Sequence, residues 1–502
     1  MISRWWLTPF CTALLFGQAK SEWVFAGPAG KLQYKADEHG NRIMDFSHAG
    51  YGGGGVRLPA PAAKVRIEPG AGDSTARIQA AIDQAAKAAP AAVVLAAGDY
   101  EAAGTVTIST SGVVLRGEPG TTIKLTGKPH RFLEIRGAGT WRIEGDPVEI
   151  VDDYVPVGAD SFRVANPAAL HPGDHVLIQK PVVAEWVHLM GMDTLVRDGK
   201  PQTWIKPGIA IRTDRVVKRV DANGRVTLDV PLSDTLEAKY GRATVVRYTF
   251  AGRIRDVGVE GLRVQAPFED VPITGPQFSL LRMDAVQDGW ARDIEVRETQ
   301  NGIVIGAAAK RLTLERVRVI HSSAHSGAAA PADFALQGTQ ILLDRCSVAG
   351  EGTWPVVTQA EVTGPIVVLD FAADHGGVSP HQRWATGLLV DHSRFTDTTE
   401  RKQGIAFSNR NTAGSGHGWD VGWAVAWNVE SPFLLVQQSP GAINWCIGCV
   451  GRAVTPAPGV SAAKAPLGTF DSPGAAVTPE SLYLAQLRDR LGAEALANIG
   501  YR

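Results

Sequence analysis

Residues 72–83 read GDSTARIQAAID, and the apolar run VVL follows at residues 93–95. Asp73 and Ser74 are residue types that cap the first turn of a helix. The apolar residues after them recur at helical spacing and then give way to a strand. A short capped helix followed by a strand is how a β-helix closes its N-terminal end, so this stretch predicts the start of a stack of coils. The apolar face of the predicted helix consists of Ile78, Ala81 and Ile82.

Short β-rich runs between turn residues continue along most of the chain. A run of this length cannot bury a face alone, but coiling and stacking give each strand a neighbour above and below. A β-sandwich is the alternative, although a sandwich of this length usually splits into domains. We therefore predict an all-β chain: a right-handed parallel β-helix with an inserted small β subdomain and short capping helices. The runs include residues 113–115, 122–125, 132–135, 259–264, 293–296, 312–320, 341–343, 366–369 and 388–390.

The composition is that of an ordered protein without a strong charge. Hydrophobic residues make up 44% and charged residues 20%, which excludes a disordered tail or linker. Lys and Arg number 50 against 51 Asp and Glu, so no global field attracts nucleic acid or a membrane surface. After the N-terminus no run reaches the roughly 18 apolar residues of a spanning helix. We expect no nucleic-acid partner and no membrane span, and the oligomeric state stays open.

The N-terminal residues have the pattern of an export signal. Arg4 supplies a positive charge, residues 5–16 are largely apolar, and small residues at 17–19 offer a cleavage site. A buried first strand is the alternative interpretation. The signal predicts a secreted or periplasmic protein.

The chain divides into five predicted segments. Residues 1–19 form the signal peptide, and residues 20–149 hold the N-terminal segment, the cap and the first coils. Residues 150–250 contain hairpin-like patterns and are predicted to be the inserted β subdomain. Residues 251–470 form the main coils with the predicted site. Residues 471–502 contain a C-terminal helix, for which Thr478-Pro479-Glu480 is the predicted start.

Three segments resemble the pectate-lyase-like superfamily. Residues 72–83 look like the N-terminal motif of its rhamnogalacturonase-like and epimerase-like members, and residues 45–55 and 481–487 look like bacterial members. The resemblance implies a pectin-lyase-like fold. That scaffold hosts lyases, hydrolases, epimerases and non-catalytic coat or tail proteins. The sequence shows neither the closely spaced Asp residues of polygalacturonases nor the acid cluster of calcium-dependent pectate lyases. We therefore expect neither type of active site in this chain.

One part of the chain concentrates residues suited to a carbohydrate groove. Residues 379–387 read SPHQRWATG, and residues 408–419 read SNRNTAGSGHGW. Tryptophan faces stack on sugar rings, arginine binds carboxylates bidentately, and histidine moves protons near neutral pH. The alternative is that the histidines are loop residues and the tryptophans fill the coil. The predicted catalytic residues here are His381, Arg383, Arg410 and His417, and the predicted substrate-binding residues are Trp384, Asn409, Asn411 and Trp419.

A second histidine group, His321 and His325, lies two or three predicted coils earlier. Their four-residue spacing serves a metal ion only on a helix, and this region follows a strand. We therefore predict a proton-transfer role for one of them beside His381, and no metal site.

Two cleavage mechanisms compete. β-Elimination needs a group that neutralises a uronate carboxylate and a base that takes the adjacent proton, whereas hydrolysis needs two carboxyl groups. The cluster is rich in His and Arg, so we predict a polysaccharide lyase in preference to a glycoside hydrolase. Epimerase activity and non-catalytic polysaccharide binding remain alternatives. No cofactor is expected, because a Ca²⁺ requirement lacks a supporting acid cluster. The acids to examine next are Asp333, Glu361 and Asp370.

Overall fold

The computed structural model describes residues 19–272, 274–322, 324, 332–456 and 463–502. The predicted export signal lies outside the described residues except for Ala19, and so does His325. None of the helices in these ranges is long and apolar enough to cross a membrane.

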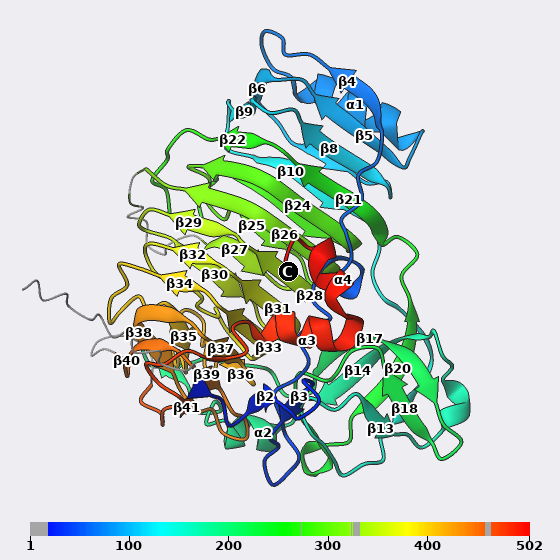
Figure 1. Cartoon of the computed structure of the whole chain (residues 1–502), viewed down its shortest axis with the longest axis vertical. Helices are drawn as coiled ribbons and strands as arrows, with labels where there is room; N and C mark the ends of the chain where they lie inside the picture. Colours follow the sequence, from blue (N-terminus) through cyan, green and yellow to red (C-terminus); the bar gives the residue numbers. More distant parts are fainter. Residues whose placement is uncertain (1–18, 273, 323, 325–331, 457–462) are drawn as a thin grey trace, which may run out of the picture.

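Parallel strands stack along the long axis of the molecule (Figure 1). In a 22-stranded sheet, β26 (Lys310–Ile320) pairs in parallel with β28 (Thr339–Asp344), and β28 pairs with β31 (Thr363–Leu369). In a six-stranded sheet, β27 (Ala332–Leu336) pairs in parallel with β30 (Trp354–Thr358). Each strand thus pairs with one a whole coil further along. The predicted parallel β-helix is confirmed, and the β-sandwich alternative is wrong.

The predicted helix and the strand after it are both present, but the stack starts one strand earlier, because β4 (Ala63–Ile67) pairs in parallel with β5 (Ala91–Leu95). Helix α1 (Thr75–Ala86) follows the N-cap residue Ser74 and buries Ile78, Ala81 and Ile82. Strand β5 (Ala91–Leu95) comes next and is buried throughout. The helix packs against the first strands and closes the end of the coil stack.

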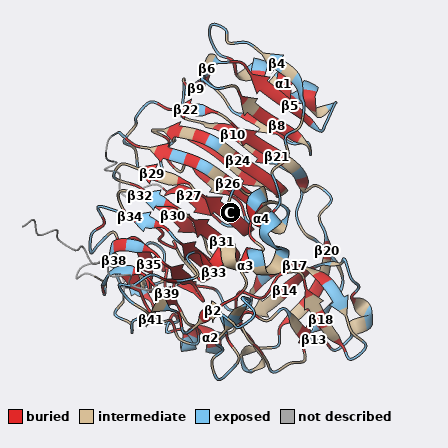
Figure 2. Ribbon diagram, in the orientation of Figure 1, coloured by how far each residue is buried: buried red, intermediate tan, exposed pale blue. Residues whose placement is uncertain are grey.

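Aliphatic side chains form continuous columns inside the coils. Alternate residues of a strand point to one face, so parallel pairing in register puts like positions directly above one another. Figure 2 shows the buried residues running through the stacked strands. Burying each Leu or Val side chain contributes about 1.5–3 kcal/mol, which favours the same register in every coil. One such column consists of Leu115, Val259, Ala291, Leu314, Leu343, Val368, Val390 and Ala426.

One corner of the coil has the same backbone conformation at each level from Gly261 to Gly448. The chain turns there through a single residue with positive φ, between +48° at Asp370 and +71° at Gly261. Most of these residues are not glycine, although a left-handed conformation strains a residue with a Cβ atom. The strain is tolerated because the turn brings both flanking strands into register with their neighbours. The corner residues are Gly261, Asp293, Arg316, Arg345, Asp370, His392, Asn428 and Gly448.

The outward face of the central coils is also apolar, and the two ends of the chain cover it. Leu342, Val367 and Leu389 lie in one column of this face. Helices α3 (Leu482–Leu491) and α4 (Ala493–Asn498) pack over it together with residues 43–49. The side-chain amide of Gln486 joins the two ends, because it donates to the Met44 carbonyl at 2.9 Å and accepts from the Phe46 amide at 2.8 Å.

The C-terminal helix begins later than the sequence predicts. Thr478 belongs to β42 (Val477–Thr478), and the helix starts at Leu482 after the cap Ser481. The Ser481 hydroxyl accepts from the Leu484 amide, and the buried Asp391 carboxylate accepts from Ser481 Oγ and from two amides of the first turn. The predicted start at Thr478-Pro479-Glu480 is wrong because a carboxylate from a distant strand stabilises the later one.

The inserted subdomain is an antiparallel sheet beside the coils (Figure 1). It begins at Arg142, earlier than the expected boundary at residue 150, because β11 (Arg142–Glu149) already pairs with β20 (Thr244–Thr249) in this sheet. Between β14 (His175–Pro181) and β17 (Ala210–Val220) lie the short helix α2 (Ala184–Leu189) and the hairpin of β15 (Val196–Arg197) and β16 (Lys200–Pro201). The six strands, in spatial order, are β11 (Arg142–Glu149), β20 (Thr244–Thr249), β14 (His175–Pro181), β17 (Ala210–Val220), β18 (Arg225–Leu228) and β13 (Ser161–Arg163).

Buried polar contacts fix the insert against the coils. The fully buried Arg215 donates to the Gly364 carbonyl at 2.7 Å. The Asp234 carboxylate accepts from Lys180 at 2.7 Å and from the indole N–H groups of Trp384 and Trp423 at 2.9 and 3.1 Å. A carboxylate of the insert thus meets two tryptophans of the coils, which sets the position of the insert.

We predict that Asp234→Ala loosens the insert. The change leaves Lys180 and two indole N–H groups buried without their acceptor, and breaking a buried pair costs about 3–5 kcal/mol. Thermal unfolding and hydrogen exchange in strands β14 and β17 measure the loss. Asp153→Ala is the matched control, because its exposed carboxylate pairs with Arg242 at the surface of the same insert. Equal stability of the two variants would contradict the role of Asp234.

Candidate functional site

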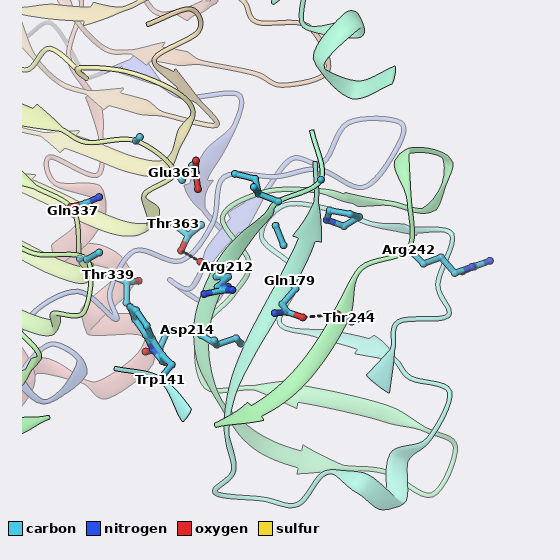
Figure 3. A pocket seen from close by; sticks show the side chains of 18 residues that line it. Trp141, Gln179, Arg212, Asp214, Arg242, Thr244, Gln337, Thr339, Glu361 and Thr363 are labelled. Atoms are coloured by element: carbon cyan, nitrogen blue, oxygen red, sulfur yellow. Dashed lines mark hydrogen bonds between the residues drawn. The ribbon is translucent and has the colours of Figure 1, made fainter. Parts of the chain in front are cut away.

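A cavity lies between the inserted sheet and the corner loops of the coils (Figure 3). Its volume is about 840 Å³, within the range of ligand sites. The corner loops follow β27 and β30, so successive coils each add one short segment to the same wall. The principal lining residues are Trp141, Gln179, Arg212, Arg242 and Thr244 from the insert side and Gln337, Thr339, Ala360, Glu361 and Thr363 from the coils.

Arg212 supplies an available positive charge in this cavity. It is exposed on β17, and its guanidinium group makes no hydrogen bond or ion pair with any residue that the structure describes. Arg242 differs, because Asp153 accepts from it at 2.9 Å. An unpaired guanidinium group facing a cavity is suited to a carboxylate or another planar anion.

The two carboxyl groups that line the cavity, Asp214 and Glu361, have pKa values shifted in opposite directions. Burial favours the protonated form of Asp214, but Lys310 and Arg253 outweigh it and hold the pKa below the usual range. This carboxylate already accepts from Lys310 and Tyr248 at 2.8 Å. Burial raises the pKa of Glu361 even though Arg383 and Arg212 oppose the shift. Glu361 is therefore the carboxyl group of this cavity better suited to carry a proton.

The coils next to the cavity bring four predicted catalytic residues together. The rings of His381 and His417 are edge to face, with centroids 4.6 Å apart. Arg410 Nη1 donates to the His381 carbonyl at 2.7 Å, and the Arg383 amide donates to the His417 carbonyl at 3.0 Å. The Glu361 amide in turn donates to the Arg383 carbonyl at 2.9 Å, so a backbone hydrogen bond joins the cluster to a residue that lines the cavity. The four cluster residues are not themselves among those that line the cavity.

Both histidines of the cluster are neutral near pH 7. Burial, followed by the charges of Arg410 and Arg383, lowers the pKa of His381 to about 4. Burial and the same arginines, with His381, lower the pKa of His417 to about 3. A neutral imidazole can accept a proton, and an anion bound beside the arginines would raise the pKa of the imidazole. His381 is half-buried, whereas His417 is buried.

The structure does not place the predicted tryptophans in a groove. Trp384 and Trp419 are 2% and 3% exposed, and they pack in the apolar interface between coils and insert. Their indole N–H groups donate to Asp234 and to the Met190 carbonyl. Stacking on a sugar needs an exposed ring face, so their predicted substrate-binding role is wrong. The tryptophan that lines the cavity is Trp141.

The two predicted asparagines support the loop that carries His417. Asn409 is buried, and its side-chain oxygen accepts from the Asn411 amide at 2.8 Å. Asn411 is half-buried and accepts from the Gly418 amide through its carbonyl at 3.0 Å. Neither residue lines the large cavity.

His321 lies at a different corner of the coil. It pairs with Asp333 at 2.8 Å where β27 begins, whereas the cavity is at Gln337, where β27 ends. Both paired side chains are shielded from solvent. The predicted position of His321 beside His381 is wrong, because counting coils does not determine the corner. His325 lies outside the described residues.

Of the three further acids, only Glu361 lines the cavity. Asp333 also accepts from Thr353, and Asp370 accepts from His392 and Tyr501. No group of three or more His, Cys, Asp or Glu residues in the described ranges is arranged to hold a metal ion.

Sequence reasoning missed Trp141, Arg212 and Arg242. Arg212 alternates with buried Ile211 and Thr213 on β17, as any solvent-facing residue of an antiparallel strand would. Nothing in its local sequence separates it from a surface arginine. Only the docked insert reveals that its side chain faces the coils.

Comparisons with known proteins find solved structures that resemble this chain but no family to which it can be assigned. No family model and no curated protein matches the chain. A tailspike of Acinetobacter baumannii bacteriophage AP22, solved with a capsular saccharide, has a TM-score of 0.37 at 10% identity over 76% of this chain. The tailspike of E. coli bacteriophage HK620 has a TM-score of 0.40 at 11% identity, covering 90% of this chain and 70% of the tailspike. The A-module of the Azotobacter vinelandii mannuronan C-5 epimerase AlgE6 has a TM-score of 0.32 at 11% identity, covering 82% and 97%.

These proteins are β-helical neighbours, and at such scores they assign no family or activity to this chain. The chain spans 51% of the AP22 tailspike. Membership of the pectate-lyase-like superfamily stays a prediction.

We predict that NMR titration of His381 gives a midpoint near pH 4. Because Arg410 is the largest charge that lowers this pKa after burial, Arg410→Met is expected to move the midpoint upward. Arg401→Met is the control, because Arg401 is exposed and does not contribute to the shift. An unchanged midpoint in Arg410→Met would show that the guanidinium charge does not depress the pKa.

Proposed function

We propose that the protein is an exported enzyme that binds a uronate-containing polysaccharide in this cavity and cleaves it by β-elimination. The observation that carries the proposal is the guanidinium group of Arg212, which faces the cavity without a partner among the described residues, together with the neutral His381 on the coil that follows Glu361. An available cation and a neutral base are the two groups that elimination needs.

The proposed reaction assigns each group one task. Arg212, supported by Arg383, binds the uronate carboxylate and stabilises the negative charge that develops beside it. His381 removes the C5 proton, the electron pair forms the C4–C5 double bond, and the bond from C4 to the glycosidic oxygen breaks. Glu361 protonates the departing oxygen, a role suited to its raised pKa.

Hydrolysis is the second candidate, because Glu361 is also suited to act as its general acid. An inverting or retaining hydrolase needs a second carboxylate that is free to act as base or nucleophile. Asp214 is the other acid of the cavity, and Lys310, Arg253 and Tyr248 already bind its oxygens. This commitment favours elimination over hydrolysis.

Trp141 is proposed to bound one end of the saccharide site in place of Trp384 and Trp419. Its ring packs edge to face on Phe250 with centroids 5.6 Å apart, which fixes its orientation. Its Nε1 atom is buried and has no hydrogen-bond partner among the described residues, so only the ring itself is proposed to contact the saccharide.

We expect cleavage of a polyuronate with a rise in ultraviolet absorbance from the unsaturated product. A panel of polysaccharides with and without carboxyl groups tests this, with reducing ends measured in parallel. His381→Ala should lower turnover by about 10²–10⁴-fold, the usual contribution of an acid–base residue. Reducing ends without absorbance would favour hydrolysis, and binding without cleavage would leave a polysaccharide-binding protein.

Arg212→Ala should abolish the preference for carboxylated substrate. Loss of the guanidinium group removes the carboxylate contact, so kcat/KM for the polyuronate should fall while weak binding of a neutral polysaccharide stays the same. Arg219→Ala is the matched control, since Arg219 lies on the same strand and pairs with Asp221 at the surface. Equal kcat/KM values for the two variants would contradict the assignment of Arg212.

A further inference from the structure

The loop at residues 411–416 lies over the ring of His417, one of the histidines of the cluster. Its stem is closed, because Arg410 donates its amide to the Gly418 carbonyl at 2.7 Å and Asn409 pairs antiparallel with Trp419. The tip at Gly414 and Ser415 is exposed. The loop is therefore firmly held at its base and reaches outward at its tip.

Side chains from two other parts of the protein hold the tip. The Gly414 carbonyl accepts from Arg197 Nη1 at 3.0 Å and from Gln202 Nε2 at 3.1 Å. Arg197 lies on β15, and Gln202 follows β16, so both belong to the inserted hairpin. Arg383 Nη2 donates to the carbonyl and the hydroxyl of Ser415 at 3.0 and 2.7 Å.

His417 is hidden by this arrangement. It is 8% exposed, and its Nδ1 atom has no hydrogen-bond partner among the residues that the structure describes. A Cβ atom at Gly414 would lie 2.1 Å from His417 Nε2, so only glycine fits over the ring. Gly414, Gly416 and Gly418 all have positive φ, where glycine is free of strain and the chain can change path easily.

We propose that residues 411–416 form a cover over the ring of His417, and that Arg197 and Gln202 of the inserted hairpin hold this cover closed. The inserted subdomain would then do more than form one wall of the cavity. It would control when the second histidine of the cluster meets a ligand, which makes Arg197 and Gln202 positioning residues. Use of this control in catalysis rests on the proposed function, whereas the cover itself does not.

The bonds at the tip suggest what opens the cover. Arg197 and Arg383 donate there to uncharged oxygens, and a guanidinium group binds a carboxylate about twice as strongly as a neutral acceptor. The carboxylates of a polyuronate would therefore compete for these two arginines and release the tip. Opening would be coupled to arrival of the anionic polymer.

Acylation by diethyl pyrocarbonate tests the cover without any saccharide. The reagent reacts with neutral imidazole nitrogens, and His417 stays neutral at the pH of the assay. Labelling rates of individual histidines are followed by peptide mass spectrometry in the full chain. His171, whose side chain is 67% exposed, serves as the accessible reference, and the shielded His321 reports global unfolding.

In the unchanged protein, His417 should react far more slowly than His171. In Arg197→Ala/Gln202→Ala it should react about tenfold faster, because the two hydrogen bonds that close the loop are lost. Lys200→Ala, an exposed position on the same hairpin, should leave the rate unchanged. Arg197→Lys keeps one donor and should restore part of the protection.

Equal His417 rates in the double variant and the unchanged protein would overturn the proposal. If labelling of His321 shows that the double variant unfolds, the single variants Arg197→Ala and Gln202→Ala are measured instead. Each removes one hydrogen bond to the Gly414 carbonyl, so each should accelerate labelling of His417 by less than about tenfold. Failure of the polysaccharide assay alone would overturn the proposed function but would not affect the proposal that residues 411–416 cover His417.

Discussion

Parallel stacking in register is the constraint on which the rest of this structure depends. Each strand must lie over its counterpart in the previous coil, because only then do the backbone hydrogen bonds and the aliphatic columns form together. The column through Leu314, Leu343 and Val368 can exist only in that register. The same requirement aligns the corner loops. The coil side of the cavity, from Gln337 to Glu361, is therefore a direct product of the stacking.

Local sequence predicts the coils well, because each strand has its own apolar run between turn residues. It predicts α1 for the same reason, since the N-cap residue Ser74 and the buried face of the helix lie in one continuous stretch of sequence. The start of the insert at Arg142 is harder, because RIEGDPVE in β11 has little apolar alternation. The start of α3 depends on Asp391, 90 residues before Ser481, and so depends on a contact that only the fold creates.

The candidate site shows the same division between local and long-range information. His381, Arg383, Arg410 and His417 come together because neighbouring coils carry them at equivalent corners, which the order of the runs indicates. Trp384 and Trp419 have side chains typical of a sugar site, but the insert buries them. Arg212 shows the reverse case. Its local sequence is that of a solvent-facing residue, but the position of the insert places its side chain in the cavity beside the coils.

The repeated left-handed corner has a consequence for how such a chain can evolve. From Gly261 to Gly448 the backbone passes the corner in the same conformation at every level. A whole coil can therefore be duplicated or deleted with the same torsion angles on both sides of the junction. Chain length then changes in discrete steps of one coil, as in other repeat architectures. Every added coil would bring one more corner loop to the wall that faces the insert, so duplication offers a direct route to a binding site that spans more units of a polymer.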